Sequence, residues 1–295
     1  MAQQIPLDQA AVAGAAADHG RTVELAPDLA YRRLAIVNVA FVGGPSAGDR
    51  GWVLIDTGII GTVSFIVSAA ASRFGADARP AAIIMTHGHF DHIGGLPELA
   101  ERWDAPVYAH PLERPYLDGS AFYPPPDPSV GGGLMSMLSP LFPRRPVDVG
   151  PRLAELPADG SVPHMPGWRW LATPGHSVGH VSFWRESDRA LIAGDAFIGT
   201  RQESAYAALV QAPELHGPPM YFTADWEKAR DSVRTLAALE PDLAITGHGP
   251  ALQGEPLRAA LHKLANEFEQ IAVPTHGRYV DHPARVEDGS AYPRS

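Results

Sequence analysis

A short apolar run, Ala81 to Met85, leads directly into the segment Thr86-His87-Gly88-His89-Phe90-Asp91-His92. Burying three imidazoles and a carboxylate together is costly unless a cation neutralises and orients them. A non-helical turn at the end of a strand would point these side chains into one space. The spacing H-x-H-x-D-H therefore predicts a metal site and a fold in which a strand ends at an edge that collects ligands.

The chain contains no cysteine, which excludes disulfides, thiolate metal ligands and a cysteine nucleophile. Any metal must be held by histidine and carboxylate ligands, which suit zinc, iron or manganese. His176, Asp195 and His248 each follow an apolar run, where a strand gives way to a loop. Together with the cluster they supply enough ligands for two metal ions.

Apolar runs and helical spacing alternate along most of the chain, which predicts an α/β architecture. At 295 residues the length suits a single large domain, residues 1–295. Strands are predicted at 34–42, 51–55, 81–85, 106–109, 168–172, 181–184, 189–193 and 243–245, and helices at 62–74, 94–103, 224–239 and 256–271.

The alternation is interrupted between Pro111 and Pro166, where 13 of the 29 prolines fall. Such density favours extended loop over regular structure. Inside this insertion, at about 111–166, the stretch Leu134 to Phe142 is strongly apolar. A loop of this length is usually functional, and two interpretations stay open: a lid over the site, or a subunit contact in a homodimer.

The motifs T-H-G-H-F-D-H, P-G-H-S-V-G-H, A-G-D and T-G-H-G-P, preceded by I-D-T-G at Ile55 to Gly58, resemble those of the metallo-β-lactamase superfamily in order and approximate spacing. They span Asp56 to His248, most of the chain. The resemblance implies a four-layer αββα sandwich with the metals at the edge between its two sheets.

The resemblance also implies a role for each site residue. His87, His89 and His176 would bind a first metal, Asp91, His92 and His248 a second, and Asp195 would bridge both. Asp56 would support the site without binding metal, as outer carboxylates that orient ligand imidazoles do. A plain turn-forming role is the alternative for Asp56.

Such a site predicts a dinuclear metal-dependent hydrolase whose nucleophile is a hydroxide shared by two divalent ions, Zn²⁺ first, with Mn²⁺ or Fe²⁺ as alternatives. Asp91 is the candidate to carry a proton to the leaving group. Tyr206, His216 and Tyr221 are candidates to stabilise an oxyanion, each with an ordinary structural role as the alternative. Lactonases of this superfamily often carry a tyrosine soon after the bridging Asp, whereas Phe197 and Ile198 follow here.

A small carboxylic ester or lactone is the predicted substrate. Asp195 stands where true β-lactamases usually carry Cys or Ser, which disfavours that activity. A thioesterase of the hydroxyacylglutathione type, a phosphodiesterase, a mono-iron sulfur dioxygenase and a non-catalytic metal-binding protein remain as alternatives.

The net charge of −10 and the absence of a basic patch argue against nucleic acid as a partner. The first 20 residues lack the pattern of a signal peptide, and no stretch approaches the roughly 20 apolar residues that span a bilayer. A cytoplasmic enzyme without membrane contact is therefore expected.

Overall fold

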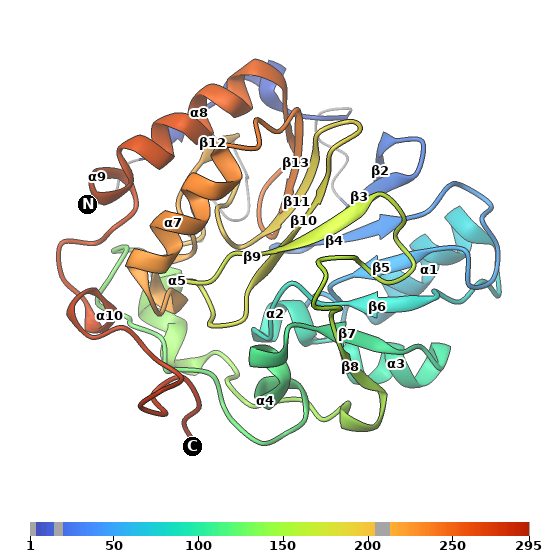
Figure 1. Ribbon diagram of the computed structural model, residues 1–295, viewed down its shortest axis with the longest axis horizontal. Coiled ribbons are helices and arrows are strands. Elements are labelled where there is room, and N and C mark those ends of the chain that lie inside the picture. The colour runs from blue at the N-terminus through green and yellow to red at the C-terminus, as the bar shows by residue number, and fades with distance from the viewer. Residues whose placement is uncertain (1–3, 15–19, 204–212, 295) are drawn as a thin grey trace.

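The computed structural model describes residues 4–14, 20–203 and 213–294. Two large β-sheets stack face to face, and helices cover the outer face of each, so that the layers run helix, sheet, sheet, helix (Figure 1). This arrangement confirms the predicted αββα sandwich. Within the described residues, no helix is long and apolar enough to cross a membrane.

The larger sheet has seven strands in the order β2-β3-β4-β5-β6-β7-β8. Its first four strands pair antiparallel, and β5 to β8 pair parallel. The strands are β2 Thr22–Ala26, β3 Leu29–Leu34, β4 Val37–Val42, β5 Val53–Ile55, β6 Ala82–Ile84, β7 Val107–Ala109 and β8 Leu153–Glu155.

The smaller sheet has five strands in the order β14-β13-β11-β10-β9. Only β11 and β13 pair parallel, the other neighbours antiparallel. Its strands are β9 Trp168–Ala172, β10 Val181–Arg185, β11 Ala190–Gly194, β13 Leu243–Thr246 and β14 Leu252–Gln253. A separate pair joins β1 Ile5–Pro6 to β12 Glu214–Leu215.

The central strands are apolar on both faces because each face meets another layer. In β5, Val53 and Ile55 belong to the core between the sheets, whereas Leu54 packs under the outer helices. In β11, Ile192 faces the core between the sheets and Leu191 the opposite layer. This double burial explains why the strands appear in the sequence as unbroken apolar runs.

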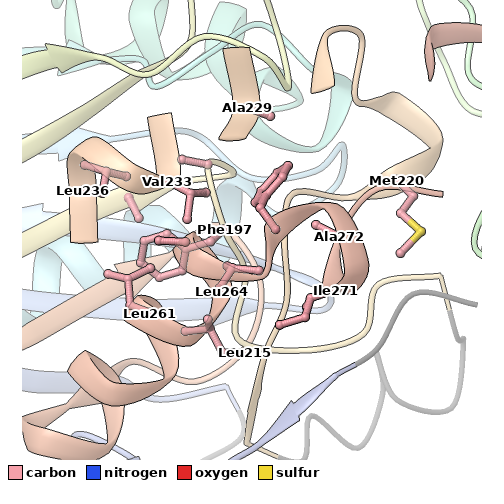
Figure 2. Close-up of a cluster of buried hydrophobic side chains, with 14 of the residues drawn as sticks. Phe197, Leu215, Met220, Ala229, Val233, Leu236, Leu261, Leu264, Ile271 and Ala272 are labelled. Carbon is pink, nitrogen blue, oxygen red and sulfur yellow. The ribbon is translucent and has the colours of Figure 1, made fainter. Parts of the chain in front are cut away.

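Helices α1 Val63–Phe74 and α3 Leu96–Trp103 cover the larger sheet. Helices α7 Trp226–Ala237 and α8 Gly254–Asn266 cover the smaller one. Figure 2 shows side chains of α7 and α8 converging on Phe197. Phe197 is fully buried in this core, so the side chain two positions after Asp195 packs against helices.

Two predicted elements need correction. The expected strand over 34–42 is a hairpin, in which Ala35, at φ +59°, begins the turn between β3 and β4. The helix over 256–271 ends at Asn266, and α9 Phe268–Ile271 follows separately. Apolar side chains at Leu264, Phe268 and Ile271 keep helical spacing through this break, so the periodicity does not reveal it.

The insertion also contains more structure than its prolines predict. It holds α4 Arg114–Leu117, α5 Leu134–Leu138 and β8, which extends the larger sheet beside β7. It also holds three short 3-10 helices, η2 Pro111–Glu113, η3 Ser139–Leu141 and η4 Gly150–Arg152, and a further one, η5 Met220–Phe222, lies outside it. The C-terminal part adds α10 Arg278–Asp281.

Candidate metal centre

The seven predicted ligands meet at one edge of the sandwich. His87 and His89 follow β6 of the larger sheet, whereas His176, Asp195 and His248 follow β9, β11 and β13 of the smaller one. Asp91 and His92 lie on a short helix, α2 Phe90–Ile93, where a non-helical turn was predicted. All seven side chains are buried, with exposed fractions between 0% and 7%.

The nitrogen atoms of His87, His89 and His176 form the first ligand group. One nitrogen from each ring lies within 4.8 Å of the others. His89 Nδ1 and His176 Nε2 are 2.8 Å apart. Two loops that are 87 residues apart in sequence therefore present their imidazoles to one small space.

Asp91, His92 and His248 form the second ligand group, with one ligand atom of each within 4.8 Å of the others. His248 Nε2 lies 3.4 Å from Asp91 Oδ2. Asp91 and His92 are consecutive residues of helix α2, which begins directly after His89.

Asp195 lies between the two groups. Its Oδ2 atom is 3.4 Å from His176 Nε2 of the first group and 3.1 Å from His248 Nε2 of the second. Its Oδ1 atom is 3.6 Å from His92 Nε2. One carboxylate thus faces both groups, which is the arrangement that a bridging ligand requires.

Three buried ligand atoms have no hydrogen-bond partner: His87 Nε2, His92 Nε2 and Asp195 Oδ1. Buried polar atoms are normally paired, because an unpaired one costs about 1–3 kcal/mol. Here the unpaired atoms point into the space that the two ligand groups share. Nitrogen and carboxylate donors of this kind suit divalent zinc, iron or manganese, so the residues present fit the predicted metals.

The outer ring nitrogens are paired in a way that leaves Nε2 for a metal. His248 Nδ1 lies 2.6 Å from the backbone carbonyl of Ile36. His87 Nδ1 lies 3.0 Å from Thr86 Oγ1. Because these oxygen atoms accept a hydrogen bond from Nδ1–H, the Nε2 lone pair of each ring is left for the ligand group.

Asp56 performs the same task for His92. Its Oδ2 atom lies 2.8 Å from His92 Nδ1 and accepts a hydrogen bond from Thr86 Oγ at 2.7 Å, while Oδ1 accepts from the Thr86 backbone N–H. Asp56 has φ +58°, an uncommon conformation for a non-glycine residue. The structure places Asp56 behind the ligand, as the sequence predicts, and its plain turn-forming role becomes secondary.

The two carboxyl groups of the site differ in their electrostatics. Burial raises the pKa of Asp91. Burial also opposes ionisation of Asp195, but the imidazoles of His248 and His92 outweigh it and hold the pKa of Asp195 well below its usual range. Groups whose environments push their pKa values apart are suited to different acid–base roles, and Asp91 is the one that takes up a proton more readily.

Glu113 was missed by sequence reasoning. Its carboxylate is fully buried and accepts hydrogen bonds from the Gly88 N–H, the Ser177 hydroxyl and the Gly179 N–H. Burial raises its pKa to about 7, and these three hydrogen bonds oppose the shift. No motif includes this residue, which lies at the start of the insertion, so nothing in the sequence pattern signals it.

Aromatic side chains line one side of the first ligand group. The rings of Tyr123 and Phe222 lie 4.6 and 5.1 Å from the ring of His89. Phe142, from the insertion, lies 5.4 Å from Phe90 and 6.1 Å from Tyr221. These five aromatic residues are called the aromatic wall: Phe90, Tyr123, Phe142, Tyr221 and Phe222.

The three residues predicted as oxyanion stabilisers differ in their position relative to the ligands. Tyr221 is buried, and its pKa is raised by burial and by the carboxyl groups of Asp91, Glu203 and Asp195, so its hydroxyl lies within electrostatic range of two ligands. His216 pairs instead with Glu214, at 3.2 Å, and belongs to neither ligand group. Tyr206 lies outside the described residues.

Comparison with known proteins identifies a family model and a relative that match most of the chain. The model of the metallo-beta-lactamase superfamily matches residues 32–248, which confirms the predicted resemblance. The chain is 46% identical over 253 residues to the probable metallo-hydrolase YflN of Bacillus subtilis (strain 168), covering 86% of this chain and 91% of that protein.

More distant proteins share part of the sequence or the fold. The hydroxyacylglutathione hydrolase of Bdellovibrio bacteriovorus is 26% identical, over 59% of this chain and 60% of its own length. Among solved structures, a beta-lactamase domain protein from Burkholderia ambifaria has a TM-score of 0.62 at 20% identity, covering 90% of this chain and 79% of that one. This last likeness shows a common fold.

Proposed function

The chain belongs to the metallo-β-lactamase superfamily and is a metallo-hydrolase of that family, and on this premise we propose that it hydrolyses a small, uncharged carboxylic ester or lactone. The observation that carries this proposal is the aromatic wall beside His89. Apolar walls with a few convergent polar groups are typical of pockets for small apolar molecules.

Two divalent ions, when bound, would lower the pKa of a water molecule that they share and polarise the substrate carbonyl. His87, His89 and His176 would hold one ion, Asp91, His92 and His248 the other, and Asp195 both. This chemistry accounts for a site without a serine or cysteine nucleophile.

Side chains of this protein would transfer the proton, hold the acyl group and donate a hydrogen bond to the substrate. Asp91, whose pKa is raised by burial, is suited to take up a proton and deliver it to the leaving alkoxide. The aromatic wall would hold the acyl group and exclude water. Tyr221, whose pKa is raised by burial and in part by Asp91 and Asp195, has a hydroxyl that would donate to the carbonyl oxygen.

The insertion contributes to this pocket. Tyr123 and Phe142 both belong to it and stand in the aromatic wall. Leu134, Met137 and Leu141 of the same segment are 54%, 71% and 78% exposed. Tyr123 and Phe142 therefore support the interpretation that part of the insertion forms a wall of the pocket. The exposed side chains of Leu134, Met137 and Leu141 would lie at the substrate entrance or in a contact with a second subunit.

A thioester is the second candidate substrate. The partial similarity to a hydroxyacylglutathione hydrolase favours it, and the same nucleophile would attack an ester or a thioester. The two candidates differ in the charge of the substrate, since a glutathione thioester carries peptide carboxylates and a lactone carries none.

A substrate panel tests the proposal. Lactones, aryl esters, glutathione thioesters and phosphodiesters would be assayed with the zinc-loaded and manganese-loaded protein, with metal content measured in parallel. We expect two ions per chain, the highest kcat/KM on a lactone or aryl ester, and loss of turnover in His248→Ala with the fold intact. Preference for a phosphodiester, or a single iron with oxygen consumed on a persulfide, would overturn it.

A further inference from the structure

We propose that Glu113 is a positioning residue that clamps the two loops of the first ligand group together and so sets the affinity for the metal ion held there. The inference rests on the proposed metal site. It concerns a residue that holds no metal and belongs to none of the motifs.

The clamp consists of three hydrogen bonds to one carboxylate. Oε2 accepts from the backbone N–H of Gly88, at 2.7 Å, and Gly88 stands between His87 and His89. Oε1 accepts from the hydroxyl of Ser177, at 2.8 Å, and from the N–H of Gly179, at 2.7 Å. Ser177 directly follows His176. One side chain therefore joins both loops that supply the first ligand group.

The close approach of these loops depends on two glycines. A Cβ atom on Gly88 would lie 3.2 Å from Glu113 Oε2 and 2.8 Å from Tyr116 Cβ. A Cβ atom on Gly179 would lie 2.9 Å from both Oε1 and Cγ of Glu113. These contacts are shorter than a side chain tolerates, so the glycines of H-G-H and V-G-H make room for the Glu113 carboxylate.

The buried environment of Glu113 explains why its carboxylate would raise the affinity of the first ligand group for a metal ion. Its side chain is 0% exposed, and among the described residues no lysine or arginine forms an ion pair with it. A buried carboxylate needs hydrogen bonds and positive charge to offset its lost hydration. The three donors supply the hydrogen bonds, and a metal cation between the two clamped loops would supply the positive charge.

The second ligand group is anchored elsewhere. His92 is held by Asp56, and its backbone carbonyl accepts hydrogen bonds from the N–H and hydroxyl of Thr57, at 2.8 and 2.6 Å. His248 is held by the carbonyl of Ile36. Loss of the Glu113 clamp should therefore weaken the first ligand group and leave the second nearly unchanged.

Glu113→Gln tests this asymmetry. Glutamine keeps the shape but has one acceptor oxygen, so its amide group must face at least one N–H donor of the loops. Zinc would be titrated against a chromophoric chelator in the wild-type protein and in Glu113→Gln. The dissociation constant of the first group is expected to rise about 10–100-fold, the range for outer-shell partners of metal ligands, with the second constant within threefold.

Two reference variants make the result specific. His248→Ala, which removes a ligand of the second group, shows which of the two constants belongs to which group. Tyr116→Phe removes the neighbouring buried hydrogen bond from the Tyr116 hydroxyl to the carbonyl of Ala291. It should lower thermal stability and leave both metal constants unchanged, because the ring that packs against Gly88 is kept and the hydroxyl that is removed bonds to neither loop.

Equal metal constants in Glu113→Gln and wild type would overturn the inference while leaving the proposed function intact. A wild-type protein that binds no second ion would overturn the two-metal proposal instead, and the variant would still test the clamp on the remaining ion. If Glu113→Gln does not fold, Ser177→Ala removes one of the three donors and should weaken the same constant by a smaller factor. An unchanged constant there would equally contradict the clamp.

Discussion

The Nε2 atom of His180 accepts a hydrogen bond of 2.9 Å from the backbone N–H of Asp195. The other ring nitrogen, Nδ1, lies 2.9 Å from Thr173 Oγ1. Because Nε2 accepts, the ring is neutral and carries its proton on Nδ1. His180 belongs to neither ligand group, yet it holds the backbone of the residue whose carboxylate faces both.

His180→Ala should weaken both ligand groups together. It leaves the buried N–H of Asp195 without a partner, at a cost of about 1–3 kcal/mol, and frees the carboxylate that both groups share. Urea unfolding and zinc titration would show lower stability and two raised dissociation constants. Ser139→Ala is the control, because it removes a buried hydroxyl of the insertion that donates to the carbonyl of Ser136. If only one constant rises, Asp195 does not bridge.

In the metal-free protein, His180 and His89 should each lower the stability in mild acid. Burial lowers the pKa of His180 to about 4 and that of His89 to about 3. Because these folded-state values lie below the unfolded value near 6.5, their stabilisation is complete above pH 6.5 and is lost as the pH falls toward 4.

For His180 alone the loss between these limits is on the order of 3 kcal/mol. Urea unfolding of chelator-treated protein at pH 7, 6 and 5 would measure it. His180→Gln, which cannot titrate, should show a shallower dependence on pH. An identical pH dependence in wild type and His180→Gln would contradict the neutral, buried state of the His180 ring.

Asp56→Asn should weaken the second ligand group. Asparagine tolerates the left-handed backbone at this position, so the fold should survive. When its single amide oxygen accepts from the Thr86 N–H, its NH2 group faces His92 Nδ1 and donates to it, so the ring carries its proton on Nε2, where it blocks metal binding. We expect the second zinc dissociation constant to rise about 10–100-fold.

Asp49→Asn, at an exposed carboxylate that pairs with Arg79, serves as the control for loss of one charge. It should leave both zinc constants unchanged. A larger effect of Asp56→Asn on the first group than on the second would show that Asp56 acts through Thr86 and His87 rather than through His92.

Phe142→Ala should impair substrate binding and spare the metals. Phe142 stands in the aromatic wall, 5.4 Å from Phe90, and its loss removes apolar contact worth about 1–3 kcal/mol to an apolar substrate. KM for an aryl ester should rise more than kcat falls, with metal content unchanged. Leu141→Ala is the matched control, since this neighbour is 78% exposed. Equal effects of the two variants would remove Phe142 from the pocket.

The metal site could be predicted because four of its ligand-type residues lie close together in the sequence. His87, His89, Asp91 and His92 lie within one short segment, and His176, Asp195 and His248 each stand at the end of an apolar strand. The α/β alternation was also predictable, since strands buried on both faces appear as unbroken apolar runs, whereas the αββα layering was implied by the resemblance to the metallo-β-lactamase superfamily. The four residues of α2 were missed because so short a helix has no periodicity of its own.

By itself, then, the sequence determined which residue types gather, that they follow strands, and that they suit divalent metals. Only the tertiary structure decided what holds them: Asp56 on His92, His180 on the backbone of Asp195, and Glu113 between Gly88 and Gly179. These partners are separated by 15 to 66 residues in sequence. Hydrogen bonds between distant segments leave no local pattern, because any carboxylate or imidazole that the fold brings within reach can form them.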